Sequence, residues 1–339
     1  MLTKEKQQSE SVPISNKRVL SLDLIKLISA FMVVFYHTGH KDLGYFVEGV
    51  YHCSIEQCLL MICSSSIPMF FMVNGALLLN KDYSNEKIYN KAGKVALLVF
   101  VWSVVDFPSW FMKTLIVLYL LYPLLKKVYN KSKYRTALMT LLFVFPFCYN
   151  LGIVFLKIIA PDFSFTLFHY NISLEVIPNR TGVFTMYSVL YFMIGGICVN
   201  NDKKTKIVPC ILCIIIGYLL VLLDVLVSST YSQEIQDAVN GCFPTMGALF
   251  IAYGLFNIIR RVNILDSSKM GRLITRTNYV VLPIYLFHMQ IIRYFYILFN
   301  IKEISAVVAF LLTLMICIIC SLIAKVMQKI PYVKELIRI

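Results

Sequence analysis

The segment SLDLIKLISAFMVVFYH, residues 21–37, decides the fold class of this chain. It is almost long enough by itself to cross the hydrocarbon core of a bilayer, which takes about 20 mainly apolar residues. Two polar side chains interrupt it, Lys26 near its start and His37 at its end. Such groups are costly inside a membrane and commonly functional. The segment therefore predicts a transmembrane helix that contributes side chains to a site.

The composition extends this interpretation to the whole chain. Of the 339 residues, 59% are hydrophobic and only 15% are charged, and the mean hydropathy is +0.74. Soluble domains have about 25% charged residues. The formal net charge of +14 comes from lysines and arginines in short tracts between apolar runs, which is how membrane orientation is encoded. The composition predicts a multi-pass protein of the lipid bilayer and no nucleic-acid partner.

The apolar runs place the individual helices. They predict spans at 19–38, 57–79, 136–158, 181–199, 207–228, 244–259, 278–298 and 304–326. The stretch 95–125 is too long for one span and has lysines on both flanks, so we expect a short hairpin that turns at residues 106–109, where an aspartate and a proline break the helix. Counting the hairpin as two, the fold is an all-α transmembrane bundle of about ten helices with both termini cytoplasmic.

The predicted domain organisation is simple. Residues 1–18 are a polar, basic cytoplasmic tail, residues 19–326 form one transmembrane domain, and residues 327–339 are a cytoplasmic C-terminal tail. The apolar run that follows the N-terminal tail has no small-residue cleavage site, so we expect a retained span rather than a removed signal peptide.

Polar residues within the spans identify a candidate site. His37 lies eleven residues beyond Lys26, close to three helical turns, so both side chains are expected on one face that borders a polar cavity. Ordinary positions at the inner and outer interfaces are the alternatives for this lysine and this histidine. His288 lies about ten residues into the ninth helix, near mid-membrane, with Arg293 five positions later. A structural hydrogen bond between helices is the alternative role for His288.

Five segments resemble successive signatures of the acyltransferase 3 family of bacterial integral membrane proteins. They are SLDLIK with the histidine eleven residues after its lysine, SIPMFFMVNGALLL, SWFMKTLIVLYLLYPLL, YSVLYFMIGG and IYLFH. The similarity runs in order from about residue 18 to 326. It implies a membrane acyltransferase that moves an acyl group, usually acetyl from cytoplasmic acetyl-CoA, to a hydroxyl of a cell-surface glycan or its lipid-linked precursor. The implied location is the bacterial cytoplasmic (inner) membrane.

The resemblance also implies roles for single residues. His37 matches the family's essential histidine and suits a general base for a sugar hydroxyl. Lys26 stands where the family has arginine and supplies a cation for CoA phosphates or the oxyanion. Lys91 and Lys94 stand where the family has an arginine pair, and they are expected to gather the CoA phosphates at the inner face.

Four further residues are expected to support the pocket, namely His288, Arg293, Asn74 and Trp110. The chain departs from the family pattern at Lys26, since lysine cannot make the bidentate contact of arginine. It also has Asn74-Gly75 where the family has Ser-Gly, and a shorter outer segment before Trp110. The shorter outer segment favours a small acceptor or a degraded enzyme.

The sequence contains no motif typical of other enzyme classes. No nucleophile elbow, phosphate-binding glycine loop or cluster with metal-ligand spacing occurs, so no metal cofactor is expected. The Cys-x-x-Cys pairs at 210–213 and 317–320 lie inside apolar runs and are predicted to be packing residues. Two alternatives to the acyltransferase stay open. One is a transporter or flippase for a lipid-linked sugar or small metabolite, and the other is a catalytically silent family member.

Overall fold

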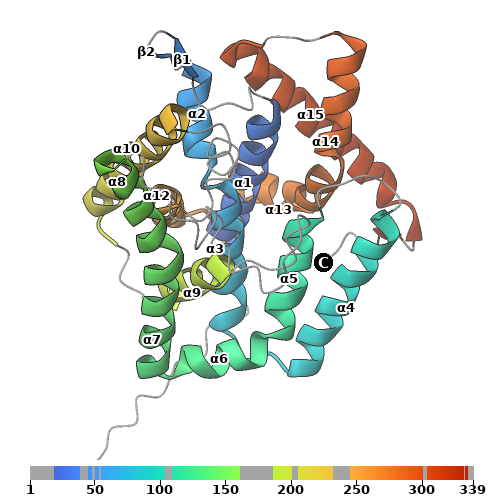
Figure 1. The fold of residues 1–339 in the computed structure, drawn as a ribbon. Coiled ribbons are helices and arrows are strands. Elements are labelled where there is room, and N and C mark those ends of the chain that lie inside the picture. The colour runs from blue at the N-terminus through green and yellow to red at the C-terminus, as the bar shows by residue number, and fades with distance from the viewer. Residues whose placement is uncertain are drawn as a thin grey trace, which may run out of the picture.

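The computed structural model describes residues 19–38, 45–47, 50–52, 55–103, 109–160, 186–200, 205–231, 245–300, 304–331 and 333–334. Figure 1 shows a bundle of helices with one small β-hairpin at one end. The hairpin pairs β1 (Tyr45–Val47) with β2 (Val50–His52) in antiparallel register. The all-α transmembrane bundle predicted from the sequence is confirmed, because five helices of the described chain are long and apolar enough to cross a membrane.

The helices follow the predicted apolar runs. Their bounds are α1 Leu20–Thr38, α2 Ile55–Cys63, α3 Ser66–Leu79, α4 Asn85–Trp102, α5 Trp110–Leu120, α6 Tyr122–Asn130, α7 Ser132–Phe143, α8 Tyr149–Ile159, α9 Met186–Asn200, α10 Ile207–Tyr231, α12 Met246–Arg260, α13 Lys269–Thr277, α14 Val281–Leu298 and α15 Ala306–Met327. A π-helical turn, Val144–Cys148, joins α7 to α8, and a 3-10 turn, Asn278–Val280, joins α13 to α14.

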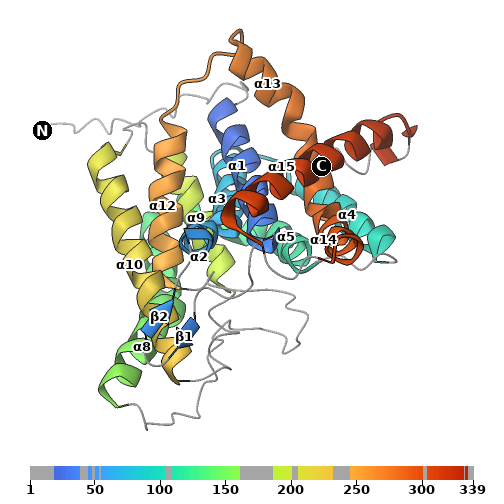
Figure 2. The ribbon, with the colours of Figure 1, turned by 90° about the horizontal axis from the view of Figure 1, so that it is seen from above.

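Helices α1 and α3 form the centre of the bundle. Figures 1 and 2 show the other helices arranged around them. Ile25 and Val34 of α1 and Phe71 of α3 are fully buried. The peripheral helices are apolar on their outer faces instead, with Leu219 of α10 56% exposed and Leu311 of α15 58% exposed. Large exposed apolar side chains along a whole helix face are what a lipid-facing surface requires.

Glycines allow α3 and α9 to cross in backbone contact. A methyl group placed on Gly75 of α3 would overlap the backbone carbonyl of Phe192, and one placed on Gly195 of α9 would overlap the backbone of Met72. Membrane helices gain little from burying apolar surface against each other, so close approach at small residues is a main source of their association. Two of the segments that carry the family resemblance therefore meet at their glycines.

Prolines account for two departures from the predicted spans. The span 57–79 is interrupted between α2 and α3 at Ser64 and Ser65, because the ring of Pro68 opposes a regular helical turn four residues earlier. The hydroxyls of these serines donate to the carbonyl oxygens of Met61 and Ile62. The span 136–158 contains the π-helical turn, which includes Pro146, a residue with no backbone N–H for a regular helical hydrogen bond.

Two helices begin earlier than the hydropathy suggested. The hairpin was predicted as two half-length helices in 95–125, but α4 begins at Asn85 and has 18 residues, whereas α5 has 11. Ser84 caps α4 by accepting a hydrogen bond from the Lys87 backbone N–H at 3.3 Å. The ninth span likewise has a basic helix, α13, before residue 278. Hydropathy missed both starts because the first turns are rich in lysine and arginine.

Helix α6 forms hydrogen bonds with the C-terminal end of α3, from which the chain continues to α4. Lys126 of α6 donates to the carbonyl oxygens of Leu79 at 2.7 Å and Lys81 at 3.2 Å, and a cation suits the C-terminus of a helix. Tyr129 donates to Asn80 Oδ1 at 2.9 Å. Burial raises the pKa of Tyr129 to about 12, so its hydroxyl keeps the proton that it donates. These bonds fix the position from which α4 starts.

Some predictions lie outside the described residues. They are the N-terminal tail 1–18, the turn residues 106–108 and the last part of the C-terminal tail, 335–339. The division into two tails and one domain, and the cytoplasmic placement of both termini, stay predictions.

Candidate active site

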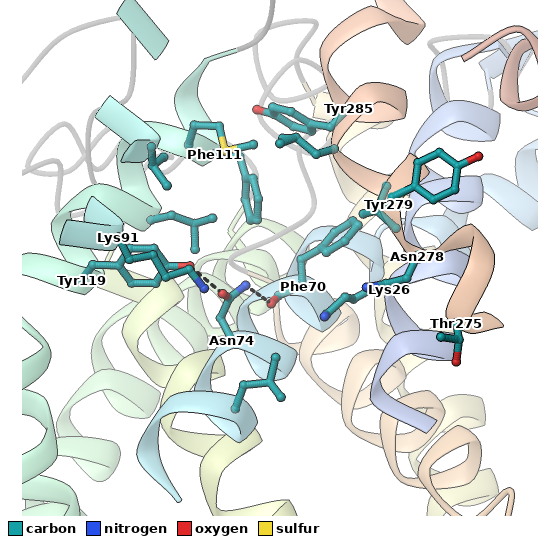
Figure 3. Close-up of a pocket in the computed structure, with 16 residues that line it drawn as sticks. Lys26, Phe70, Asn74, Lys91, Phe111, Tyr119, Thr275, Asn278, Tyr279 and Tyr285 are labelled. Atoms are coloured by element: carbon teal, nitrogen blue, oxygen red, sulfur yellow. Dashed lines mark hydrogen bonds between the residues drawn. The ribbon is translucent and has the colours of Figure 1, made fainter. Parts of the chain in front are cut away.

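A cavity of about 480 Å³ lies between two groups of helices. The elements α1, α13 and α14 supply one wall, α4 and α5 the other, and α3 the floor between them, as the close-up in Figure 3 shows. Lys26 and Lys91 approach the cavity from opposite sides, with Asn74 between them. Three residues predicted to form the site are thus brought together.

Lys26 enters from α1 and is held by a carboxylate one turn away. Its Nζ donates to Asp23 Oδ1 at 3.1 Å. The side chain of Lys26 is 24% exposed, whereas that of Asp23 is 7% exposed. The two side chains form an ion pair at i,i+3 on one face of the helix. Lys26 is therefore a fixed cation at the cavity wall.

Lys91 enters from α4 through an aromatic contact. Its Nζ lies 5.1 Å from the centroid of the Tyr119 ring, within the range of a cation–π interaction. The Tyr119 hydroxyl donates to Asn74 Oδ1 at 2.9 Å, and Asn74 Nδ2 donates to the Phe70 carbonyl at 2.9 Å. Asn74 thus supports the pocket by orienting Tyr119, whose ring contacts Lys91 (Figure 3).

Aromatic rings form the opposite end of the cavity. The Phe111 and Tyr285 rings lie 5.5 Å apart, and Phe111 also contacts Phe71 at 5.0 Å. Beyond the cavity lining, Trp102 at the end of α4 meets Phe287 of α14 edge to face at 5.1 Å. Such aromatic pairs hold helices in register while keeping an apolar surface. The cavity is therefore cationic at one end and aromatic at the other.

Two histidines lie next to each other beyond the aromatic end. The ring centroids of His37 in α1 and His288 in α14 are 5.3 Å apart, and His288 is 6.3 Å from the cavity residue Tyr285. His37 is exposed and His288 is 1% exposed. Depth counted along the sequence places His288 near mid-membrane, whereas His37 is the last residue but one of α1. The contact corrects this, because it places both rings at one level.

The hydrogen bonds of His288 define its tautomer. Its Nδ1 lies 2.8 Å from the Ile284 carbonyl oxygen and 3.0 Å from that of Tyr285. Since carbonyl oxygens only accept, Nδ1 carries a proton and donates it to them. Nε2 is buried and has no hydrogen-bond partner among the described residues. The pair thus joins an accessible imidazole to a buried one whose Nε2 is left without a partner among the described residues.

Polar contacts anchor the end of α1 directly after His37. The Thr38 and Thr313 hydroxyls are 2.8 Å apart, which ties α1 to α15. Tyr296 of α14 donates to the Thr38 carbonyl at 2.7 Å. Hydrogen bonds between helices are effective in a bilayer, where no water competes for them. They hold the backbone that carries His37 beside the helix that carries His288.

Besides the two histidines, three further residues predicted for the site lie outside the cavity lining. Lys94 of α4 is exposed, one turn beyond Lys91. Arg293 of α14 is also exposed and does not line the cavity. Trp110 is half-buried and contacts Phe111 edge to face at 6.3 Å, so it supports the aromatic end indirectly.

Sequence reasoning missed several residues that build the site. Tyr119 and Tyr285 line the cavity and Asp23 pairs with Lys26. The acid at i−3 from a lysine inside an apolar run was a usable signal for Asp23. The tyrosines carried no such signal, because the chain has 21 of them and only the fold selects which ones meet Lys91 or His288.

The bundle and its site together define a class of protein, the multi-pass membrane protein with histidines next to a cation-lined cavity. The family model described as an acyltransferase domain matches residues 19–107 and 104–325. The chain therefore belongs to the acyltransferase 3 family, and the protein is a membrane acyltransferase. No curated protein and no solved structure matches the chain significantly.

Proposed function

We propose that the protein transfers an acyl group, acetyl in the simplest case, from cytoplasmic acyl-CoA to a hydroxyl of a cell-surface glycan or its lipid-linked precursor. The membrane in which it acts is proposed to be the bacterial cytoplasmic membrane. One observation carries the proposal, namely the contact of His37 with His288 beyond the aromatic end of a cavity whose other end holds Lys26 and Lys91. Membership of the acyltransferase family favours this function over transport.

The cationic end of the cavity suits the acyl donor, acyl-CoA. Two lysines on opposite walls can hold anionic phosphates of CoA at the mouth of the cavity, while the aliphatic and aromatic lining accommodates the uncharged thioester arm. Lysine binds phosphate as a point charge rather than through a planar fork. In this arrangement Asp23 and Tyr119 are positioning residues, since each holds one of the two lysines in place.

The histidine pair supplies the proton chemistry. His37 takes the proton of the acceptor hydroxyl while that oxygen bonds to the thioester carbonyl carbon. The carbon–sulfur bond then breaks, and the leaving thiolate of CoA takes the proton back from the His37 imidazolium. His288 is fixed through Nδ1, so it positions His37 and stabilises the imidazolium that forms. No metal takes part in these steps.

Reconstitution tests this function directly. Purified protein in vesicles that also contain a membrane extract from the source cells is supplied with acetyl-CoA carrying a labelled acetyl group. We expect label in the glycan or glycolipid fraction and an equal amount of free CoA thiol. Thiol release with all label left as free acetate would indicate a hydrolase. Label crossing the vesicle membrane without thiol release would indicate a transporter.

The two lysines of α4 form a matched pair for testing the donor site. Lys91→Gln removes a cation from the cavity wall, and we expect the KM for acyl-CoA to rise about tenfold, equivalent to ~1.4 kcal/mol. Lys94→Gln removes the same charge from an exposed position one turn away, so we expect less than about a twofold change, as is typical for an exposed charge. Steady-state kinetics at saturating acceptor give both values. Equal effects of the two variants would assign the phosphates to the surface of α4 instead of the cavity.

A further inference from the structure

A second cavity lies on another side of the bundle from the candidate active site. It has a volume of about 190 Å³ and is formed by α7, α9, α12 and the segment before α10. None of its lining residues lines the larger cavity. Met139 of α7 with Ile194 and Ile197 of α9 supplies an apolar wall. This cavity takes no part in the chemistry proposed above.

The other end of this cavity carries hydrogen-bond donors and a positive charge. Thr205, Tyr253 and Arg260 line it, and none of the described residues that line it is a carboxylate. The Arg260 Nε is buried and has no hydrogen-bond partner within the described part of the chain. A buried guanidinium nitrogen without an acceptor is costly. An anion in the cavity would remove that cost. It could also accept from the Tyr253 hydroxyl, and from the Thr205 hydroxyl once this turns away from Asn257 Oδ1, to which it donates at 3.5 Å.

The position of the cavity in the fold indicates the source of the anion. Arg260 ends α12 and is followed by Arg261, which donates to the Thr205 carbonyl and fixes the segment before α10. Both arginines belong to a basic tract that the topology places at the cytoplasmic face. The apolar wall then runs from this face toward the bilayer interior. A basic pocket between transmembrane helices at this level suits a lipid headgroup with its acyl chains along the apolar side.

We propose that this cavity binds the phosphate of an anionic phospholipid from the cytoplasmic leaflet. The Arg260 guanidinium pairs with the phosphate oxygens, the Thr205 and Tyr253 hydroxyls complete the headgroup site, and the acyl chains lie against Met139 and Ile194. The bound lipid links α7 and α9 to α12 and thereby stabilises this side of the bundle. The site is independent of the acyl-transfer function.

The test uses the full-length protein in detergent, with native mass spectrometry and thermal unfolding. Phosphatidylglycerol, phosphatidylcholine and inorganic phosphate are added separately. For the wild type we expect one retained phosphatidylglycerol and a rise in Tm of several degrees, with little effect from the other two. Arg260→Gln should bind this lipid at least about tenfold more weakly, since it loses the charge-assisted bonds. Lys269→Gln, which removes an exposed cation of α13 outside both cavities, should behave as the wild type.

Three results of this experiment would overturn the proposal. Equal stabilisation by inorganic phosphate would show a free-anion site, and equal effects of the two lipids would show that the headgroup charge is not recognised. Undiminished lipid binding by Arg260→Gln would exclude the arginine as the anchor. If Arg260→Gln does not accumulate, Thr205→Val removes one donor while keeping the charge, and its lipid affinity should still fall about threefold, a change of roughly 0.6 kcal/mol within the usual range for one hydrogen bond.

Discussion

Replacing His37 with alanine is expected to lower the rate of acyl transfer by about 10²–10⁴-fold, the usual contribution of general base catalysis. The donor KM should stay within about twofold of the wild type, because His37 does not line the cavity that holds Lys26 and Lys91. A loss in kcat with an unchanged KM separates a role in proton transfer from one in donor binding. The amount of protein in the membrane serves as the control, measured for each variant alongside the kinetics.

His288→Ala distinguishes the roles of the two histidines. We expect a smaller loss, about tenfold to a hundredfold, because His37 keeps its own ring but loses the neighbour that positions it at 5.3 Å. A larger loss for His288→Ala than for His37→Ala would move the base role to His288. That result, with His288→Ala inactive and His37→Ala active, contradicts the assignment made here.

The second large effect is expected at the crossing of α3 and α9. Gly75→Ala places a methyl group onto the backbone carbonyl of Phe192, and neither backbone can yield without separating the two helices. We expect a loss of roughly 3 kcal/mol or more of stability and little protein in the membrane. Gly195→Ala in α9 should cause a similar loss of stability, because its methyl group meets the backbone of Met72. Thermal unfolding and membrane abundance measure both variants.

Gly93→Ala is the matched control for the glycine variants. A methyl group on Gly93 of α4 meets nothing within 4 Å among the described residues. Alanine also favours a helix over glycine by about 1 kcal/mol, so this variant should be as stable as the wild type or slightly more stable. Equal losses from Gly75→Ala and Gly93→Ala would mean that the close crossing of α3 and α9 is not what limits stability.

The fold was largely predictable because hydropathy reports directly on membrane spans. The run that starts at residue 19 is α1, and the run predicted at 304–326 is α15. The predictions were less accurate where local backbone chemistry overrides hydropathy. Pro68 breaks one span into α2 and α3, and lysine-rich first turns hid the true starts of α4 and α13. A window that averages hydrophobicity cannot detect either effect.

The candidate site was predictable only where polar residues stood out against an apolar background. Lys26, Asn74 and Lys91 line one cavity as expected. The contact between His37 and His288 could not be predicted, because it depends on how α1 and α14 pack and on the depth of each. Tyr119 and Tyr285 were hidden for a different reason, since an aromatic residue in a membrane span is indistinguishable from ordinary packing until its neighbours are known.

The most direct measurement of the central claim is mass spectrometry of surface glycans and glycolipids from matched cells. The cells express the wild type, His37→Ala or Lys26→Ala at equal membrane levels, or lack the protein. The acyl-transfer account predicts a species heavier by one acyl unit in wild-type cells only, with Lys26→Ala reduced and His37→Ala equal to the cells without the protein. An identical acylated species in the wild-type and His37→Ala cells would contradict it, because the proposed base would then be dispensable.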